Sequence, residues 1–303
     1  MDKIKFSTPI IIKKSEMGGA YDSIISGIGS CFAQYIMEHL KKLGFNASYN
    51  PNGIVYNAVS ISKSLDHIVN DREYDASNFI KHNNLWHSWE HHGSFSAPTQ
   101  AQLKENINKA KTYFFKQLAK SVLFILTPSS SVVYCLNDSS AITANCHKYP
   151  GKYFTKKVLS TAHNAKAISA CIESIKKINS SCKIIITLSP VRHYPGNLVL
   201  NAHSKANLLS AIHQCVGNFD NVAYFPSYEI LLDELRDYRF FNEDMLHPTD
   251  FAKKIILQRF ISTYFTAECQ KIITEKEKLL KSQQHKIGGH LLVAETLSKK
   301  VED

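Results

Sequence analysis

The chain has 303 residues, of which 44% are hydrophobic and 20% are charged, so it is long and apolar enough to bury a full-sized core. Its formal charge of +10 could favour nucleic acid, an anionic membrane or a phosphorylated ligand, but the lysines are scattered in pairs, which is more typical of a solvated surface. No apolar run is long enough to span a bilayer, the N-terminus lacks the apolar region of a signal peptide, and the seven cysteines contain no CxxC pair. We therefore expect a cytoplasmic protein without a disulfide framework, with neither a membrane nor a nucleic acid as partner.

Short apolar runs alternate with helical segments along the chain, a pattern typical of a parallel sheet with helices on both faces. We expect strands at 23–30, 45–50, 121–130, 183–190 and 222–230. Helices are expected near 32–43, 57–69, 100–119, 160–179 and 203–216, with a last core helix from about Thr249. The predicted fold class is α/β, with three α/β/α layers around a mostly parallel sheet of roughly five strands.

Three segments depart from this alternation. Residues 71–100 are polar and loop-like, and residues 132–146 contain two short apolar stretches that predict an inserted hairpin. Residues 267–303 are charged and helix-prone, with a small apolar face at 290–301. We predict one domain over 1–266 and a helical C-terminal tail over 267–303 that packs on the core or on a partner chain, and the oligomeric state stays open.

Polar side chains follow each predicted strand, at the edge of the sheet where open parallel sheets bind their ligands. The groups are of nucleophile, amide, cationic and imidazole type: Ser30, Cys31, Asn52, Gly53, Ser129, Arg192, His193, Asp244 and His247. Because the carboxyl ends of parallel strands meet at one edge, we expect these groups to converge there.

Ser30 and Cys31 stand between a strand and a helix. The amides at a helix N-terminus stabilise a negative charge, so they would lower the pKa of a thiol and form part of an oxyanion hole. The simpler interpretation is that Ser30 caps the helix and Cys31 fills the core. The spacing alone favours neither interpretation.

Asp244 and His247 are three residues apart, close enough to face the same way. The imidazole would serve as a general base while the carboxylate fixes its tautomer. The alternative interpretation of this segment is a capping role before the helix that follows.

The segment GIGSCFAQYI resembles the motif that names the GSCFA family, a branch of the SGNH/GDSL hydrolase-like superfamily. The similarity continues through NPNGIVYN, LWHSWEHHG, ANCHK, SPVRH and YFPSYEILLDELRDYRFFNEDMLHP, and covers roughly residues 20–262. The resemblance implies an SGNH/flavodoxin-like fold. It implies the reaction less firmly, because one fold hosts many chemistries.

In SGNH enzymes a Gly-Asp-Ser turn supplies the nucleophile, and a late Asp-x-x-His supplies the rest of the triad. The resemblance places Asp244 and His247 in the latter roles, and an ungapped match places Cys31 on the nucleophile, whereas a shift of one residue would place Ser30 there. We prefer Cys31 because a thiolate is the stronger nucleophile near neutral pH.

The resemblance also implies two oxyanion donors. Gly53 fits the first, but Thr127–Ser130 lacks the asparagine expected for the second, so Ser129, Asn57 or Asn145 would have to substitute. This departure weakens the expectation of ordinary ester hydrolysis.

The remaining imidazole and aromatic groups have neither HExxH nor CxxC spacing, so we predict no metal. We expect Trp86 and His87, with Trp89, to form a lid over the pocket, and His147 to belong to the binding site. Arg192 and His193 would hold an anionic group, such as a coenzyme phosphate or an acidic sugar.

Taken together, the residues and the resemblance predict an SGNH-like acyl-handling enzyme, an esterase or O-acyltransferase. Its substrate would be a small molecule or glycan, either an acylated carbohydrate or a thioester donor. We expect no cofactor, with acetyl-CoA as a candidate co-substrate. The alternative is a catalytically degenerate protein of the same fold that binds a carbohydrate or a nucleotide-like ligand.

Overall fold

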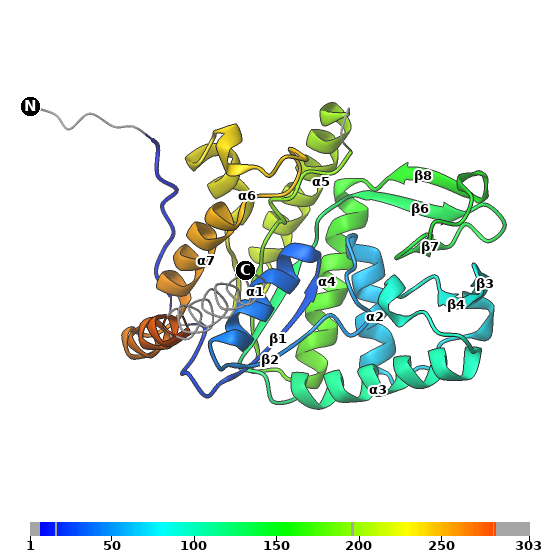
Figure 1. Ribbon diagram of the computed structural model, residues 1–303, viewed down its shortest axis with the longest axis horizontal. Helices are drawn as coiled ribbons and strands as arrows, with labels where there is room; N and C mark the ends of the chain where they lie inside the picture. Colours follow the sequence, from blue (N-terminus) through cyan, green and yellow to red (C-terminus); the bar gives the residue numbers. More distant parts are fainter. Residues whose placement is uncertain (1–6, 16, 195–196, 281, 283–303) are drawn as a thin grey trace, which may run out of the picture.

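The computed structural model describes residues 7–15, 17–194, 197–280 and 282 (Figure 1). Its central sheet has five parallel strands in the order β10-β9-β5-β1-β2. The strands are β1 (Ile24–Gly29), β2 (Asn46–Tyr49), β5 (Leu123–Thr127), β9 (Lys183–Ile186) and β10 (Val222–Tyr224). Counted in chain order from the β2 edge, this is the flavodoxin-like order 2-1-3-4-5. The predicted α/β fold with a parallel five-stranded sheet is therefore confirmed.

Helices cover both faces of this sheet (Figure 1). One face packs against α1 (Cys31–Lys42) and α7 (Asp250–Tyr264). The other face packs against α2 (Ala58–Val69), the C-terminal part of α3 (Gln100–Leu118), α4 (Thr161–Ile178) and α5 (Leu198–Val216). Short helical segments complete the chain: η1 (Ala76–Asn78), η2 (Gly93–Phe95), η3 (Gly151–Tyr153), α6 (Ser227–Glu229), η4 (Ile230–Glu234) and η5 (Tyr238–Phe240).

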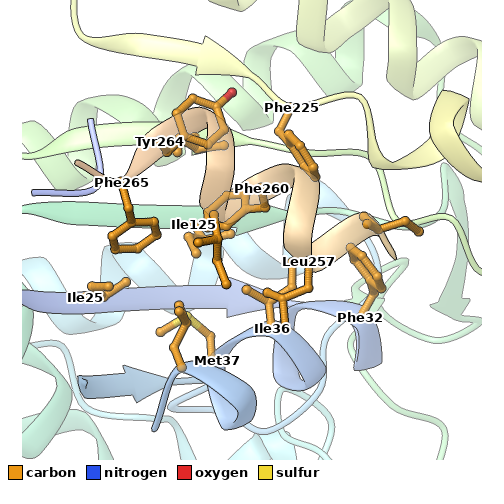
Figure 2. Packing of buried hydrophobic residues seen from close by; sticks show 14 of the residues in the cluster. Ile25, Phe32, Ile36, Met37, Ile125, Phe225, Leu257, Phe260, Tyr264 and Phe265 are labelled. Carbon is orange, nitrogen blue, oxygen red and sulfur yellow. The ribbon is translucent and has the colours of Figure 1, made fainter. Parts of the chain in front are cut away.

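The strands are buried on both sides, and successive side chains enter different halves of the core. In β5, Ile125 packs with α1 and α7, whereas its neighbours Phe124 and Leu126 pack with α2, α4 and α5. Figure 2 shows the first half, where Phe260 of α7 and Ile36 of α1 close over Ile25 and Ile125. This double burial explains why the strands are continuous apolar runs.

Two small antiparallel sheets lie beside the central one, and the sequence pattern missed part of both. Residues 71–100, expected to be a loop, contain the hairpin of β3 (Phe79–His82) and β4 (Leu85–Ser88), whose turn residues Asn83 and Asn84 have φ of 48° and 62°. The expected hairpin near 132–146 is present as β6 (Val132–Leu136) and β7 (Ile142–Thr143). It also pairs with β8 (Phe154–Val158), which has a largely exposed face and therefore lacks an apolar signal.

Two boundaries differ from the expectation. The fifth strand ends at Tyr224, because Pro226 has no N–H to continue the ladder and a short helical segment follows. Helix α5 begins at Leu198 rather than near 203, since the Asn197 side chain caps it by accepting from the N–H of Leu200 at 2.9 Å. Helix α7 follows the Thr249 cap as expected.

The first part of the C-terminal tail, residues 267–280, is helical, and Cys269 and Ile273 are buried in the same core half as α1 and α7. Residue 281 and residues 283–303, including the expected apolar face at 290–301, lie outside the described residues. The domain boundary at 266 stays a prediction. Within the described part of the chain, no helix has the length and apolarity needed to cross a membrane.

Candidate active site

The turn between β1 and α1 is pressed tightly against β5. The Ser30 N–H donates to the Thr127 carbonyl at 3.1 Å, and the Gly29 N–H donates to Oδ1 of Asn50 at 2.9 Å. Gly29 has φ of 149°, and a Cβ there would lie 2.2 Å from the Thr127 carbonyl oxygen. Only glycine fits this approach, and the turn brings the start of α1 to the carboxyl edge of the sheet.

Ser30 and Cys31 occupy different environments in this turn. Ser30 is fully buried, its Oγ has no hydrogen-bond partner, and it makes no side-chain cap of α1. Cys31 is the first residue of α1 and is partly exposed. The pKa of the Cys31 thiol is raised, because burial outweighs the hydrogen bonds from the Phe32 and Cys31 amides and the charges of Lys205 and Lys253, which act to lower it. The expectation that the helix N-terminus lowers this pKa is therefore wrong.

Asp244 and His247 form a hydrogen-bonded pair on the loop before α7. The Asp244 Oδ2 lies 2.7 Å from Nδ1 of His247, and Oδ1 accepts from the N–H groups of Leu246 and His247 at 2.8 and 3.0 Å. These hydrogen bonds, the one from the His247 N–H first, lower the pKa of Asp244 to about 2. A carboxylate on Nδ1 leaves Nε2 as the nitrogen that can exchange a proton with a substrate.

His193 connects the two parts of the site. Its ring lies 5.4 Å from that of Tyr56, and its Nε2 lies 2.5 Å from Oγ of Ser129. Burial, and then the Cys31 charge, raise the pKa of Tyr56. Burial, assisted by the charges of Lys205 and His247, lowers the pKa of His193 to about 3. His193 is therefore neutral near pH 7. Its neighbour Arg192 donates its N–H to the Leu246 carbonyl at 3.0 Å, which joins this loop to the one that carries Asp244 and His247.

Lys205 is a residue of this edge that the sequence analysis missed. It lies on α5, is 1% exposed, and its Nζ donates to the Ser189 carbonyl at 2.6 Å. Burial lowers its pKa to about 7, opposed by the Cys31 charge. The spacing carried a usable signal, because Lys205 falls three and seven residues before the apolar Leu208 and Ile212, on the buried face of the helix.

The expected oxyanion donors are engaged in local structure. Gly53, with φ of 73°, uses its N–H in a turn to the Asn50 carbonyl at 2.8 Å, and the Ser129 N–H donates to the Tyr56 carbonyl at 2.8 Å. The Asn57 side chain caps α2. The N–H groups of Gly53 and Ser129 are therefore used in internal hydrogen bonds, whereas Asn57 and Asn145, which accept through Oδ1, line the cavity described below.

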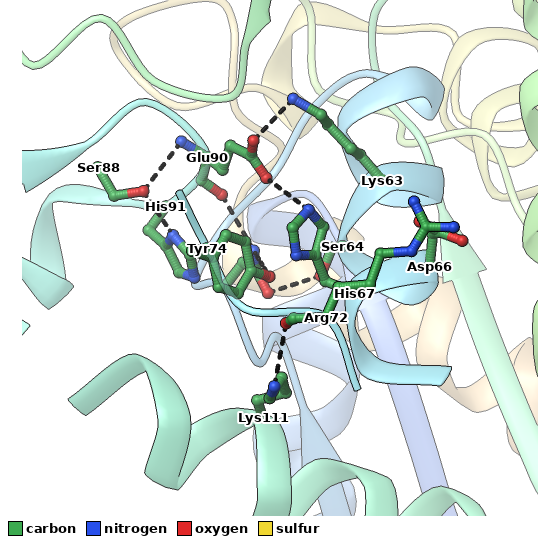
Figure 3. Close-up of polar contacts among 11 residues, drawn as sticks. Lys63, Ser64, Asp66, His67, Arg72, Tyr74, Ser88, Glu90, His91 and Lys111 are labelled. Atoms are coloured by element: carbon green, nitrogen blue, oxygen red, sulfur yellow. Dashed lines mark hydrogen bonds and ion pairs between the residues drawn. The ribbon is translucent and has the colours of Figure 1, made fainter. Parts of the chain in front are cut away.

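Asn52 and the segment 85–92 belong to a buried polar network away from the thiol. Asn52 donates to the Tyr74 hydroxyl and the Glu90 carbonyl at 3.0 and 3.1 Å. Figure 3 shows the neighbouring contacts, in which Glu90 binds Lys63 at 2.7 Å and His91 contacts Ser88 at 2.8 Å. This network holds the β3–β4 hairpin on α2, so we read its polar groups as structural.

Trp86, His87 and Trp89, expected to form a lid, and His147, expected in the binding site, are not among the residues that line the pocket described below, although the Trp89 ring packs against Tyr149 and Phe154 of its wall. Trp86 bridges to Ala97 in a small ladder. His87 contacts Ser96 Oγ at 2.6 Å, and His147 contacts the Ser88 carbonyl at 2.7 Å. Burial is the main reason that the pKa of His147 is lowered to about 4.

A cavity of about 450 Å³ opens beside the site, between the β6–β8 sheet and the loop before α2. Its walls are rich in aromatic rings, with amide and imidazole groups among them: Tyr56, Tyr134, Tyr149, Tyr194, Phe154, Asn57, Asn145 and His193. The described lining residues include no Asp, Glu, Lys or Arg. Arg192 lies elsewhere, with its guanidinium 4.0 Å from the centre of the Phe241 ring.

No group of three His, Cys, Asp or Glu side chains lies close enough to hold a metal ion in the part of the chain that the structure describes. The histidine-rich stretches are instead used in pairwise hydrogen bonds and ring contacts.

The sequence matches the model of the GSCFA family over residues 24–260, and the chain belongs to this family. No curated protein matches the sequence. The resemblance seen in the GIGSCFAQYI motif is thereby confirmed.

Solved structures with similar folds include a protein from Streptococcus pneumonia whose description connects it with platelet activating factor (12% identity, TM-score 0.41, 79% of this chain and 84% of the other). Others are carbohydrate esterases of family 3 from Talaromyces cellulolyticus (8%, 0.38, 84% and 97%) and Clostridium thermocellum (11%, 0.38, 80% and 94%).

Proposed function

We propose that the protein is an acyl-handling enzyme, an esterase or an O-acyltransferase, with the Cys31 thiol as its nucleophile. The observation that carries the proposal is the placement of Cys31 at the first position of α1, partly exposed, with the Cys31 and Phe32 N–H groups directed at its sulfur. A nucleophile must be reachable, and the fully buried Ser30 hydroxyl is not. This contrast favours Cys31 over Ser30.

In the proposed mechanism His247 accepts the thiol proton as Cys31 attacks the acyl carbonyl. Asp244 holds the imidazole through its 2.7 Å contact with Nδ1 and stabilises the imidazolium that forms. His247 then returns the proton to the departing alcohol or thiol, which leaves a thioester on Cys31. Water or a sugar hydroxyl attacks this thioester, giving hydrolysis or acyl transfer, and the thiol is restored.

The aromatic lining of the cavity is suited to a neutral, ring-shaped substrate. Tyrosine rings stack on the apolar faces of sugars, and hydroxyl and amide groups such as Asn57 and Asn145 suit sugar hydroxyls. The described walls carry no ionised side chain to pair with a phosphate or an acidic sugar. We therefore place an acylated neutral carbohydrate before acetyl-CoA as the occupant of this cavity.

The proposal also includes a cytoplasmic location. All seven cysteines are free thiols in the structure, which suits a reducing compartment. No resident cofactor is needed for the steps above, and acetyl-CoA remains a candidate acyl donor.

A ligand-binding protein without catalysis is the second candidate. This candidate is favoured because the Gly53 and Ser129 N–H groups are both used in internal hydrogen bonds and therefore do not stabilise an oxyanion. Such a protein would bind an acylated sugar in the aromatic cavity and leave it intact.

Hydrolysis of an activated aryl acetate and of an acetylated neutral sugar tests the two candidates. An enzyme of the proposed type turns them over, and His247→Ala lowers kcat/KM about 100-fold or more because the general base is lost. His163→Ala is the matched control, since His163 also contacts a partner three residues away, Ser160 at 2.7 Å, but lies on an exposed helix end. Unchanged turnover in His247→Ala contradicts the proposal, and tight binding of the sugar without turnover in the wild type establishes the second candidate.

A further inference from the structure

Two of the five arginines in the sequence, Arg192 and Arg236, have no carboxylate within ion-pair distance among the described residues, and neither guanidinium makes a described hydrogen bond. The other three form ion pairs: Arg72 with Asp66 at 3.1 Å, Arg239 with Asp237 at 3.7 Å and Arg259 with Glu234 at 2.7 Å. Arg192 and Arg236 both line one cavity of about 220 Å³, which we call the arginine cavity. Two unpaired guanidinium groups in one cavity indicate an anionic ligand.

The described lining of the arginine cavity includes one acidic side chain, Asp237. Its Oδ1 accepts the N–H of Arg239 at 2.9 Å, and its Oδ2 lies 3.7 Å from Nε of the same residue. The carboxylate is therefore already paired with a cation outside the lining, and Asp237 is not a binding group of the cavity. The other wall residues are apolar or aromatic: Leu231, Leu232, Tyr238 and Phe241.

Ring contacts hold the Arg192 guanidinium in the wall of the arginine cavity. Its central carbon lies 4.0 Å from the centre of the Phe241 ring and 5.6 Å from that of the Tyr238 ring. Stacking of this kind uses the flat face of a guanidinium and leaves the N–H groups at its edge. Because these N–H groups have no described acceptor, they are available to bind an anion through two parallel hydrogen bonds.

The arginine cavity adjoins the loop that carries Asp244 and His247. Arg192 donates its backbone N–H to the carbonyl of Leu246, the residue before His247, at 3.0 Å. The next residue in the chain, His193, lines the aromatic cavity. The loop after β9 therefore contributes one residue to each cavity, so a ligand in one cavity is separated from a ligand in the other by this loop alone.

We propose that Arg192 and Arg236 form a subsite for a phosphate ester group of the substrate. The inference rests on the proposed function, in which the neighbouring His247 loop supplies the general base. Two guanidinium groups match the two negative charges of a phosphate monoester, and each can bind two of its oxygens. The aromatic cavity then holds a neutral ring and the arginine cavity holds the phosphate. The phosphate belongs either to a coenzyme thioester that donates the acyl group or to a phosphorylated sugar.

The test is isothermal titration calorimetry of the full chain with three probes: inorganic phosphate, coenzyme A and glucose 6-phosphate. In Arg236→Met the dissociation constant of the tightest probe is expected to rise about 10-fold or more, because charge-assisted hydrogen bonds are lost. Arg192→Met, whose side chain can still pack on Phe241, is expected to show a similar loss. Arg72→Met is the matched control, since Arg72 is exposed, is paired with Asp66 and is not part of the cavity lining, and it should bind the probes as the wild type does.

Tighter binding of coenzyme A than of glucose 6-phosphate identifies a coenzyme donor, and the reverse order identifies a phosphorylated sugar. Wild-type dissociation constants in Arg236→Met, or no binding of any probe by the wild type, overturn the inference. Arg236 is exposed, so its substitution leaves the core intact and decides the question even if Arg192→Met does not fold.

Binding is measured without turnover, so the two proposals can fail separately. Arginine-dependent binding of a probe without any acyl chemistry refutes the proposed function and leaves the phosphate subsite standing. Acetylation of Cys31 by an aryl acetate without binding of any probe refutes the phosphate subsite and leaves the proposed function standing.

Discussion

Ser30 and Cys31 are neighbours at the start of α1, but their side chains differ in exposure to solvent. The Ser30 hydroxyl is directed into the protein, where its oxygen is buried and has no partner. The Cys31 sulfur stays partly exposed and faces the amides of the first helical turn. Ser30 precedes the helix in an extended conformation, with φ of −72° and ψ of 178°, whereas Cys31 is the first helical residue, so the two side chains leave the backbone in different directions.

Ser30→Ala is therefore expected to leave acylation intact. An unpaired buried hydroxyl contributes no hydrogen bond, so its removal should change the free energy of unfolding by less than about 1 kcal/mol. Urea unfolding and labelling with an activated acetate measure both effects. Loss of labelling with an unchanged fold would instead make Ser30 the nucleophile.

The Asp244 carboxylate is expected to support catalysis through its negative charge and through its hydrogen bonds with the His247 ring and with the N–H groups of Leu246 and His247. Asp244→Asn keeps the size of the side chain but no longer stabilises the imidazolium, so kcat should fall about 10³-fold or more. Asp237→Asn is the control, since Asp237 is an exposed carboxylate that likewise accepts a backbone N–H, from Arg239 at 2.9 Å. Equal activity of the two variants would contradict the role of Asp244.

At the scale of elements, the β1–α1 turn depends on the glycine that precedes the nucleophile. Gly29→Ala would place a methyl group 2.2 Å from the Thr127 carbonyl oxygen, so the free energy of unfolding should fall by about 3 kcal/mol or more. Gly93→Ala is the control, because no atom lies within 4 Å of its would-be Cβ. Thermal unfolding compares them, and similar melting temperatures would show that the turn is looser than described.

Helices and strands were predicted correctly where a buried apolar run and a terminating residue indicated the same element. The buried runs of β1, β5 and β9 and the stop at Gly44, which has φ of 97°, left little choice of structure. Strand pairing was missed where it leaves no apolar pattern in the sequence. Examples are β8, whose residues are mostly exposed, and the hairpin closed by the Asn83–Asn84 turn. The β10 end was missed because Pro226 lay within an apolar run.

The site was predictable in part for a similar reason. The position of Ser30 and Cys31 at the start of α1 and the contact between Asp244 and His247 follow from motif and position, since strand ends and helix starts fix where such residues lie, and their catalytic roles stay predictions. Asn52 was expected among the groups at this edge, but its amide bonds to partners 22 and 38 residues away in sequence, which a local pattern does not reveal. Lys205 was overlooked since a lysine on a helix is ordinarily solvated, and only the packing of α5 reveals its burial.

For the molecule as a whole, several buried imidazoles couple folding to pH. Burial lowers the pKa of His91 and of His193 to about 3, and that of His147 to about 4, from the ordinary value of 6.5. Between the folded and the unfolded pKa the unfolded chain binds more protons, so stability rises with pH over this range. The stabilisation is complete above about pH 6.5 and is lost as the pH falls toward 3.

Each such histidine is expected to cost about 2 kcal/mol of stability when the pH falls from about 7 to about 5. His91→Gln should therefore show a smaller decrease in melting temperature over this interval than the wild type. His163→Gln, at an exposed helix end, should follow the wild type. An unchanged pH dependence in His91→Gln would mean that the pKa of this imidazole is the same in the folded and unfolded states, against the lowering by burial.

The most direct test of the whole account is intact-mass analysis with peptide mapping after brief exposure to an activated aryl acetate and, separately, to acetyl-CoA. We predict one acetyl group on Cys31, formed more slowly in His247→Ala and formed normally in Ser30→Ala. Acetylation confined to Ser30, or no adduct in the segment 29–33 while an acetylated sugar still binds, would contradict a thiol-based acyl-handling enzyme.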